Sequence, residues 1–320
     1  MRVLTGIQPS GQLHLGNYFG AMKPVIQMQS EGEVYLFIAN YHALTTVDEP
    51  ELLRKTTEDV ALDFLACGLD PDTVVMYRQS DVPEVTELTW LLSVVTPMGL
   101  LERCTSYKDK IARGVMASHG LFSYPVLMAA DILSVQANVV PVGRDQKQHL
   151  EVARDLAMKF NRKFGEVFTI PEPKIQESVA LVPGLDGQKM SKSYDNIIEL
   201  FGSPSVVRKK IMRIVTDSKT VDEEKDPQES TIFALYKLLS SPEEQKDMAE
   251  RFRAGGMGYG DAKKALYEKF EEQMGPFREK RAELSRNPAA IEEVLTRGAA
   301  KARGVIQETL RRARRSVGLE

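Results

Sequence analysis

The stretch EVYLFIA, residues 33–39, carries the clearest information about the fold. It is an almost continuous apolar run, which is typical of a strand buried on both faces of a sheet. Comparable short runs stand at residues 3–4 (VL), 73–77 (TVVMY) and 138–142 (NVVPV). Segments with helical periodicity alternate with these four runs, so together they predict a parallel sheet covered by helices.

The helices predicted around these strands begin near Asn17 and span residues 50–66 and about 145–164. After Ile198 the strand pattern stops, and the remaining sequence has helical periodicity in five segments: residues 204–215, 231–239, 242–253, 260–284 and 289–315. We therefore expect an α/β parallel-sheet domain over residues 1–200 and an all-helical domain over residues 201–320. The first domain can also include part of the last helix.

The composition is that of an ordinary globular protein, with 42% hydrophobic and 27% charged residues and a net charge of -3 over 320 residues. No apolar run approaches the roughly 18–20 residues that cross a bilayer, and the N-terminus lacks the pattern of a signal peptide. Cys67 and Cys104 are too few for a disulfide framework. We expect a cytoplasmic protein with no membrane or DNA partner and no metal site held by protein ligands.

The stretch GIQPSGQLHLGNYFG, residues 6–20, joins the first predicted strand to the first predicted helix. Backbone N–H groups and the dipole at a helix N-terminus form a natural phosphate site. Gly16 would let a nucleotide approach the backbone, and His14 could donate to a phosphate. The stretch is neither a Walker loop nor a GxGxxG fingerprint, so by itself it is equally well interpreted as a glycine-rich connection.

The stretch KMSKS, residues 189–193, follows the turn-rich PGLDG of residues 183–187. Two lysines beside small hydroxyls suit a clamp on polyphosphate, because a lysine charge can follow a leaving group as its charge develops. Taken alone, such a loop is more often solvated surface.

Together, the two stretches resemble the HIGH and KMSKS motifs of class I aminoacyl-tRNA synthetases. The second is a full match, and the first reads HLGN, which departs from the pattern at Leu15 and Asn17. GIQPSG, YPVLMAADIL, VPVGRDQKQHLE, KMSKS and IVTDS follow in the order found in bacterial tryptophanyl-tRNA synthetases, which the sequence resembles from residue 3 to the end. The resemblance implies a Rossmann-like catalytic domain followed by a helical tRNA anticodon-binding domain.

The resemblance also implies a reaction. ATP, with Mg²⁺ carried on its phosphates, activates L-tryptophan to an adenylate and releases pyrophosphate. The tryptophan then passes to the 3′ end of tRNA(Trp), and the enzyme acts as a homodimer. Such chemistry requires mainly positioning and charge stabilisation.

The same resemblance assigns residues to three overlapping groups. Those placed in catalysis are His14, Asn17, Lys110, Lys189, Lys192 and Ser193. Those placed around ATP are Gln8, Pro9, Ser10, Gly16, Asn17, Gly143, Arg144, Asp145, Ala180, Lys189, Met190, Ser191, Lys192 and Ser193. Those placed around tryptophan are Gln8, Tyr124, Met128, Asp131, Val140, Val142 and Gln146. Within the last group, Asp131 is the expected acceptor for the indole N–H, whereas His42 and His149 are interpreted as structural polar residues.

Two departures from the family pattern leave details open. Arg144 stands where the familiar sequences usually carry Glu, and VALVPGLDGQ, residues 179–188, replaces the usual segment before KMSKS. Two other functions also stay open. A tyrosyl-tRNA synthetase would share the fold and the ordered motifs, and a non-catalytic paralogue would only bind RNA or a regulatory ligand.

Two surface features have alternative meanings. The basic residues of the last helix and of the segment after residue 204 suit contacts to tRNA phosphates, or they are solvated helix faces. These residues are Lys301, Arg303, Arg311, Arg312, Arg314 and Arg315, and Arg208, Lys209, Lys210 and Arg213. The apolar stretch LTWLLSVVTPMGLL, residues 88–101, is either a dimer interface or a buried core helix.

Overall fold

The fold is known from a computed structural model of residues 1–320. The structure describes the chain except for Ser10 and residues 105–106, 109–111, 113, 115–116, 143–146 and 176–181. It also leaves the side chains of Val142, Lys147, Ile175 and Ser193 undescribed.

A five-stranded parallel sheet forms the centre of the first part of the chain, in the order β3-β2-β1-β4-β5. The strands are β1 (Arg2–Ile7), β2 (Glu33–Ile38), β3 (Val74–Arg78), β4 (Val139–Val142) and β5 (Glu172–Ile175). The chain steps outward from β1 to β3 and then returns to place β4 on the other side of β1. In open sheets of this kind, ligands bind at the carboxyl ends of the strands where the order reverses.

The two faces of the sheet are buried by different helices, as the alternation of side chains along each strand requires. One face, with Val34, Leu36 and Ile38 of β2, belongs to a core that also holds residues of α2 (Lys23–Met28) and α4 (Pro50–Ala66). The other face, with Tyr35 and Phe37, belongs to a core that also holds residues of α5 (Glu84–Ser93), α8 (His119–Ser134) and α9 (Lys147–Phe164). This two-sided burial explains the uninterrupted apolar run that the sequence shows in β2.

The remaining helices complete the chain around this sheet. In the first two hundred residues they are α1 (Leu15–Asn17), η1 (Tyr18–Met22), α3 (Asn40–Ala43), η2 (Gln79–Asp81), α5 (Glu84–Ser93), α6 (Met98–Glu102), α8 (His119–Ser134), α9 (Lys147–Phe164) and η4 (Lys192–Tyr194). Beyond them lie α10 (Pro204–Met212), α11 (Thr231–Leu239), α12 (Pro242–Ala254), α13 (Tyr259–Leu284) and α14 (Pro288–Ser316). Among the described residues, no helix combines the length and the apolar character that a membrane span requires.

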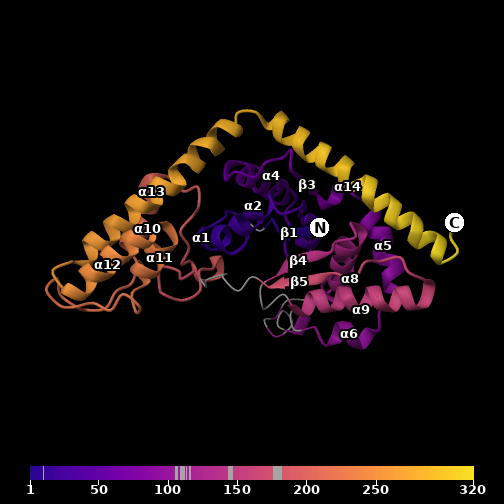
Figure 1. The fold of residues 1–320 in the computed structure, drawn as a ribbon, viewed down its shortest axis with the longest axis horizontal. Helices are drawn as coiled ribbons and strands as arrows, with labels where there is room; N and C mark the ends of the chain where they lie inside the picture. Colours follow the sequence, from indigo (N-terminus) through magenta and orange to yellow (C-terminus); the bar gives the residue numbers. More distant parts are fainter. Residues whose placement is uncertain are drawn as a thin grey trace.

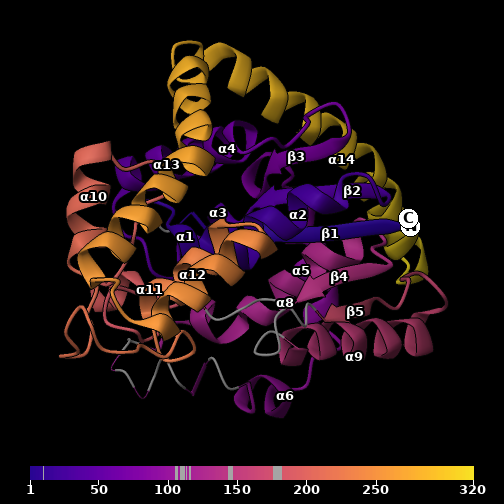
Figure 2. The ribbon, with the colours of Figure 1, turned by 60° about the vertical axis from the view of Figure 1, so that its left-hand side comes forward.

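The helical end of the molecule is not a single separate body. Figure 1 shows α10, α11 and α12 gathered at one end, with α13 leading away from them to α14 at the other. The view in Figure 2 also shows α14 running past α4 and β3. Helix α14 packs mainly on β3 and α5, whereas α13 packs on α10, α11 and α4. The limits 1–200 and 201–320 stay a prediction, to which the structure adds that the last helix lies against the sheet.

The sequence missed one strand. β5 reads EPKI and follows Pro171, so it contains a proline and has another directly before it. Proline removes a backbone donor and is tolerated in sheets mainly at an edge, and β5 is the edge strand beside β4. Of the helices predicted from periodicity, residues 50–66 and 231–239 match α4 and α11, and the others differ by a few residues at their ends.

Helix α14 covers the other edge of the sheet through a glycine. A β-carbon at Gly298 would lie 1.8 Å from the carbonyl oxygen of Met76 in β3. Only a residue without a side chain therefore lets the helix approach the strand so closely. The backbone groups of an edge strand are otherwise open to pairing with another chain.

We predict that Gly298→Ala lowers the free energy of unfolding by about 1–3 kcal/mol, because the methyl group forces the helix away from the strand. Gly304→Ala is the matched control on the same helix, since a β-carbon there meets nothing within 4 Å. The control should raise stability by up to about 1 kcal/mol through helix propensity alone. Urea denaturation of both variants measures the difference, and equal effects would contradict the packing described.

Candidate active site

Backbone hydrogen bonds join the first motif stretch to the segment that follows KMSKS, residues 198–200. The amide of Leu15 donates to the carbonyl of Ile198 at 3.0 Å, and the amide of Leu200 donates to the carbonyl of Leu13 at 2.9 Å. His14 and Glu199 form the antiparallel bridge between them. The segment directly after KMSKS is thus fixed to the loop that precedes α1. The structure brings together two regions that are far apart in the sequence.

His14 occupies a buried position at the start of α1. Its amide donates to the side-chain oxygen of Asn17 at 3.1 Å, so Asn17 caps the helix start. The ring is 6% exposed, and its Nδ1 finds no hydrogen-bond partner among the described residues. Burial, followed by the charge of Lys192, lowers the pKa of His14 to about 4. The ring is therefore neutral near pH 7, so it carries hydrogen-bonding groups and no charge.

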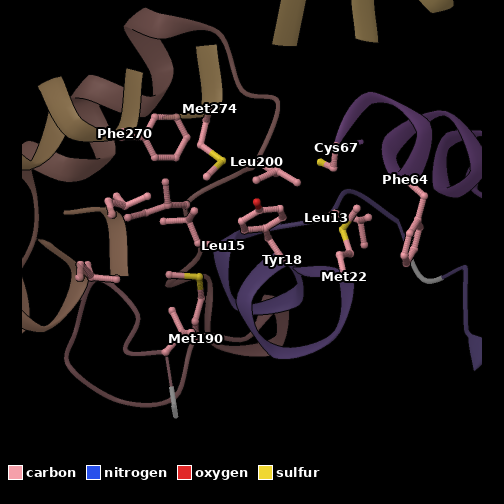
Figure 3. Close-up of a cluster of buried hydrophobic side chains, with 14 of the residues drawn as sticks. Leu13, Leu15, Tyr18, Met22, Phe64, Cys67, Met190, Leu200, Phe270 and Met274 are labelled. Carbon is pink, nitrogen blue, oxygen red and sulfur yellow. The ribbon is translucent and has the colours of Figure 1, made fainter. Parts of the chain in front are cut away.

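The KMSKS loop touches the glycines of the first loop. A β-carbon at Gly11, where φ is +94°, would lie 3.6 Å from the Nζ of Lys192, and a β-carbon at Gly16 would lie 3.5 Å from Cβ of Met190. Met190 is buried and reaches toward Leu15 and Tyr18 (Figure 3). Met190 thus anchors the loop in the core. Burial lowers the pKa of the Lys192 ammonium, and an anion bound beside it would counter that cost.

A buried carboxylate marks the second part of the site. Asp131 of α8 is 2% exposed, and it accepts from Nε2 of Gln79 at 2.9 Å and lies 2.9 Å from Nε2 of His42. Burial raises the pKa of Asp131, and the hydrogen bonds from His42 and Gln79 oppose that rise. Among the described residues, these contacts occupy three of the roughly four acceptor positions of a carboxylate.

Beside this network lies a cavity with a volume of about 320 Å³. His42, Tyr124 and Leu127 are among the side chains that line it. The hydroxyl of Tyr124 lies 2.9 Å from Nε2 of His149. His42 and His149 therefore belong to a polar network around the cavity, which their scattered positions in the sequence did not show.

Gln8 connects the two parts of the site. It is the first residue after β1, and its Nε2 lies 3.4 Å from the carbonyl of His42 and 3.4 Å from Oγ1 of Thr46. Pro9 beside it is buried, and its carbonyl accepts from Thr56 of α4. The first loop is thus held at one end beside the cavity and at the other by the segment after KMSKS, residues 198–200.

The other predicted site residues fall into two groups. Met128 and Val140 lie in the hydrophobic core that α8 shares with β4, and Lys189 is exposed at the start of the KMSKS loop. Seven residues lie outside the described part of the chain: Ser10, Lys110, Gly143, Arg144, Asp145, Gln146 and Ala180. The side chains of Val142 and Ser193 are likewise undescribed.

Gln79 is a site residue that sequence reasoning missed. It stands directly after β3 and is 1% exposed. Its position after a buried strand was an available signal, because polar residues at strand ends gather at one edge of a parallel sheet.

Several basic residues of the last helix have intramolecular partners. Arg303 contacts Glu84 at 2.6 Å and Arg314 contacts Glu87 at 2.5 Å, both on α5. In the segment after residue 204, Lys210 contacts Glu199 at 2.5 Å, directly beside His14. These contacts give the three residues a packing role within the chain.

The comparisons with known proteins agree with this geometry. Residues 1–274 match the sequence profile of the family described as tRNA synthetases class I (W and Y). Proteins named tryptophan–tRNA ligase from Rhodopirellula baltica and Campylobacter jejuni are 54% and 50% identical, and each alignment covers 100% of both chains.

Solved structures give the same result. The crystal structure of tryptophanyl-tRNA synthetase from Campylobacter jejuni complexed with ADP and tryptophan has a TM-score of 0.95, at 50% identity over 100% of both chains. Tryptophanyl-tRNA synthetase from Mycoplasma pneumoniae has a TM-score of 0.84 at 33% identity, over 100% of this chain and 98% of that one. The fold, the paired motif loops and these similarities lead to one conclusion: the chain belongs to the class I tRNA synthetases of the tryptophan and tyrosine family.

Proposed function

We propose that the protein is a tryptophan–tRNA ligase. It activates L-tryptophan with ATP to tryptophanyl-adenylate and then transfers the tryptophan to the 3′ end of tRNA(Trp). The observation that carries this proposal is the pairing of residues 13–15 with residues 198–200, which places Lys192 beside Gly11 and Met190 beside Gly16. The full-length similarity to proteins named tryptophan–tRNA ligase supports it.

ATP is proposed to bind between the first loop and the KMSKS loop. The first loop faces the KMSKS loop at Gly11, beside Lys192, and at Gly16, beside Met190. Lys189 and Lys192 neutralise the phosphates. His14, which is neutral, donates to a phosphate rather than adding a charge. The further ATP contacts from Ser10, Lys110, residues 143–145, Ala180 and Ser193 remain those that the family resemblance implies. Mg²⁺ would arrive bound to ATP and offset the negative charge of the phosphates.

Tryptophan is proposed to bind on the α8 side of the first loop. Asp131 accepts the indole N–H at the acceptor position that His42 and Gln79 leave open. Tyr124 and Gln146 would hold the ammonium and carboxylate groups, with Met128, Val140 and Val142 along the ring. Gln8 lies between the two substrates, where it can orient the carboxylate toward ATP.

The reaction then needs little chemistry from the protein beyond positioning. An oxygen of the tryptophan carboxylate attacks the α-phosphorus, and the bond to the β-phosphate oxygen breaks, so pyrophosphate leaves. The lysines of the KMSKS loop stabilise the charge that develops on the leaving group. In the second step, a ribose hydroxyl of the tRNA attacks the activated carbonyl and AMP leaves.

We further propose a cytoplasmic homodimer. Three side chains near α5 and α6 support an interface: Trp90, Val94 and Met98 are 71%, 57% and 63% exposed. Leu88, Leu91 and Leu92 of the same stretch are buried in the core. The stretch thus serves the core on one face and leaves large apolar side chains on the other, as is typical of a protein–protein contact. The helical end of the chain, with α10 and α13, is proposed to meet tRNA(Trp).

We predict that tryptophan, and not tyrosine, supports ATP–pyrophosphate exchange by the purified chain. The Asp131 network provides an acceptor for the indole N–H, and the full-length relatives of the chain are named tryptophan–tRNA ligase. Exchange of labelled pyrophosphate into ATP measures this with each amino acid in turn. Exchange with tyrosine alone would identify a tyrosyl-tRNA synthetase, and exchange with neither would identify a non-catalytic paralogue.

Asp131→Asn should lower kcat/KM for tryptophan by about ten- to a hundredfold, because the new amide places a donor against the donors of Gln79 and His42. The KM for ATP should stay unchanged. Asp72→Asn is the control, since Asp72 is exposed and paired only with Arg297 in the structure described. Unchanged tryptophan kinetics in Asp131→Asn would contradict the proposed binding mode.

Lys192→Ala should lower kcat of the exchange reaction by about a hundredfold or more, as is usual when a group that stabilises developing charge is removed. Tryptophan affinity should change little, since Lys192 lies beside Gly11 on the ATP side of the site. The matched control is Lys246→Ala, an exposed lysine of α12. Equal exchange rates in the two variants would show that the KMSKS loop does not act on the phosphates.

A further inference from the structure

The KMSKS loop is preceded by a tight hairpin. Met190 donates its amide to the carbonyl of Val182 at 2.9 Å, and Gly184 donates to Gln188 at 2.6 Å. Pro183 and Lys189 form an antiparallel bridge, and Gly187 has a φ of +81° at the turn. The hairpin therefore delivers Lys189 and Met190 in a fixed backbone conformation, and the loop turns away from it at Ser191.

One buried side chain bridges the hairpin and the loop. Asn196 is 3% exposed. Its Nδ2 donates to the carbonyl of Lys189 at 3.1 Å and to Oδ1 of Asp186 at 2.7 Å, and its Oδ1 accepts from the amide of Ser191 at 2.8 Å. Both amide protons and the carbonyl oxygen of the side chain are thus used. The contacts to Lys189 and Ser191 lie on either side of Met190. The side-chain amide of Asn196 therefore pairs with this backbone as an adjacent strand of a sheet would.

The surroundings of Asn196 leave it little freedom. A β-carbon at Gly184 would lie 2.3 Å from Cγ and Nδ2 of Asn196, so the amide packs directly on the hairpin backbone. The carbonyl of Asn196 accepts from the amide of Leu185 at 2.9 Å. The preceding residue, Asp195, has a φ of +50°, in a region that non-glycine residues adopt at some cost. Asp195 adopts this conformation where the chain leaves the loop, directly before Asn196.

We propose that Asn196 is a positioning residue for the activation step: its side-chain amide, tied to Asp186, holds the backbone of Lys189–Ser191 in the shape that presents the two KMSKS lysines to the phosphates of ATP. The proposal rests on the proposed role of this loop in binding ATP. It assigns Asn196 no contact with substrate.

The hydrogen-bond pattern makes the role sensitive to small chemical changes. An aspartate at position 196 keeps the size of the side chain but loses both donors, and it places a carboxylate beside that of Asp186. The pKa of Asp186 is lowered in the native chain, first of all by the hydrogen bond from Asn196. An alanine leaves the Lys189 carbonyl and the Ser191 amide without this partner, and buried unsatisfied groups are costly.

The chain contains a matched control for a purely structural asparagine. Asn161 is also buried, at 7% exposed, and its amide also holds a turn of backbone. Its Nδ2 donates to the carbonyl of Phe168 at 2.8 Å, and its Oδ1 accepts from the amides of Val167 and Phe168. This turn joins α9 to β5 and has no part in the proposed site. Asn161→Ala should therefore lower the melting temperature and leave the kinetics for ATP unchanged.

The test measures ATP–pyrophosphate exchange, with thermal melting in parallel. We expect Asn196→Ala to lower kcat/KM for ATP by about ten- to a hundredfold and to leave the KM for tryptophan unchanged. Asn196→Asp should lose more at pH 8 and recover part of its activity, relative to the native chain, as the pH falls, because a protonated aspartic acid regains a donor. In the Lys192→Ala background, Asn196→Ala should add little further loss, since two residues that act through one loop are not additive.

Three results would overturn the proposal. The first is a lower melting temperature with unchanged ATP kinetics, as expected of Asn161→Ala. The second is full additivity with Lys192→Ala. The third is full exchange activity in Lys192→Ala itself, which would remove the loop's proposed role and the positioning role with it. If Asn196→Ala does not fold, Asp186→Ala is measured instead, because Asp186 is exposed and its replacement should leave the fold intact. A lowered kcat/KM for ATP in that variant supports the positioning role of Asn196, and an unchanged value contradicts it.

Discussion

The short backbone pairing between residues 13–15 and 198–200 is the constraint on which the proposed site depends. It joins the loop after the first strand to the segment after the KMSKS loop, and each of these segments continues into a different part of the chain. Three groups meet here without a covalent link: the ring of His14, the ammonium of Lys192 and the backbone at Gly11. Without this pairing, two flexible loops would have to be ordered separately, and each would lose conformational entropy when ATP binds.

The same region concentrates polar groups that burial makes costly. His14 has a ring nitrogen without a described partner, and Lys192 is partly desolvated. A ligand with negative charge beside Lys192 would offset the desolvation of its ammonium group. The Asp131 network differs, because its bonds to His42 and Gln79 largely satisfy the carboxylate before any ligand arrives. The Asp131 side of the candidate site is thus built on completed hydrogen bonds, whereas the other side holds a buried ring nitrogen of His14 without a partner among the described residues.

Much of the fold could be predicted from the sequence, and the reasons are local. The apolar run of β2 and the periodicity of α4 and α11 reflect burial patterns that each segment carries by itself. The prolines in and before β5 argue against a strand in the sequence. Proline is tolerated at the edge of a sheet, but the segment alone does not show that it lies at an edge. The motif stretches identified His14 and Lys192 as candidates. In contrast, Gln79, His42 and Asn196 take their roles from partners distant in the fold or from backbone carbonyls, and no spacing rule in the sequence encodes such pairings.

The covering of β3 by α14 has a consequence for the order in which the chain is made. Residues 288–316 are synthesised more than two hundred positions after β3, and chains emerge and begin to fold from the N-terminus. Until the last helix arrives, the outer edge of β3 offers unpaired backbone groups to any other strand in reach. The nascent chain therefore passes through a stage in which its sheet can form but its edge is unprotected. This stage ends when α14 packs against β3 at Gly298.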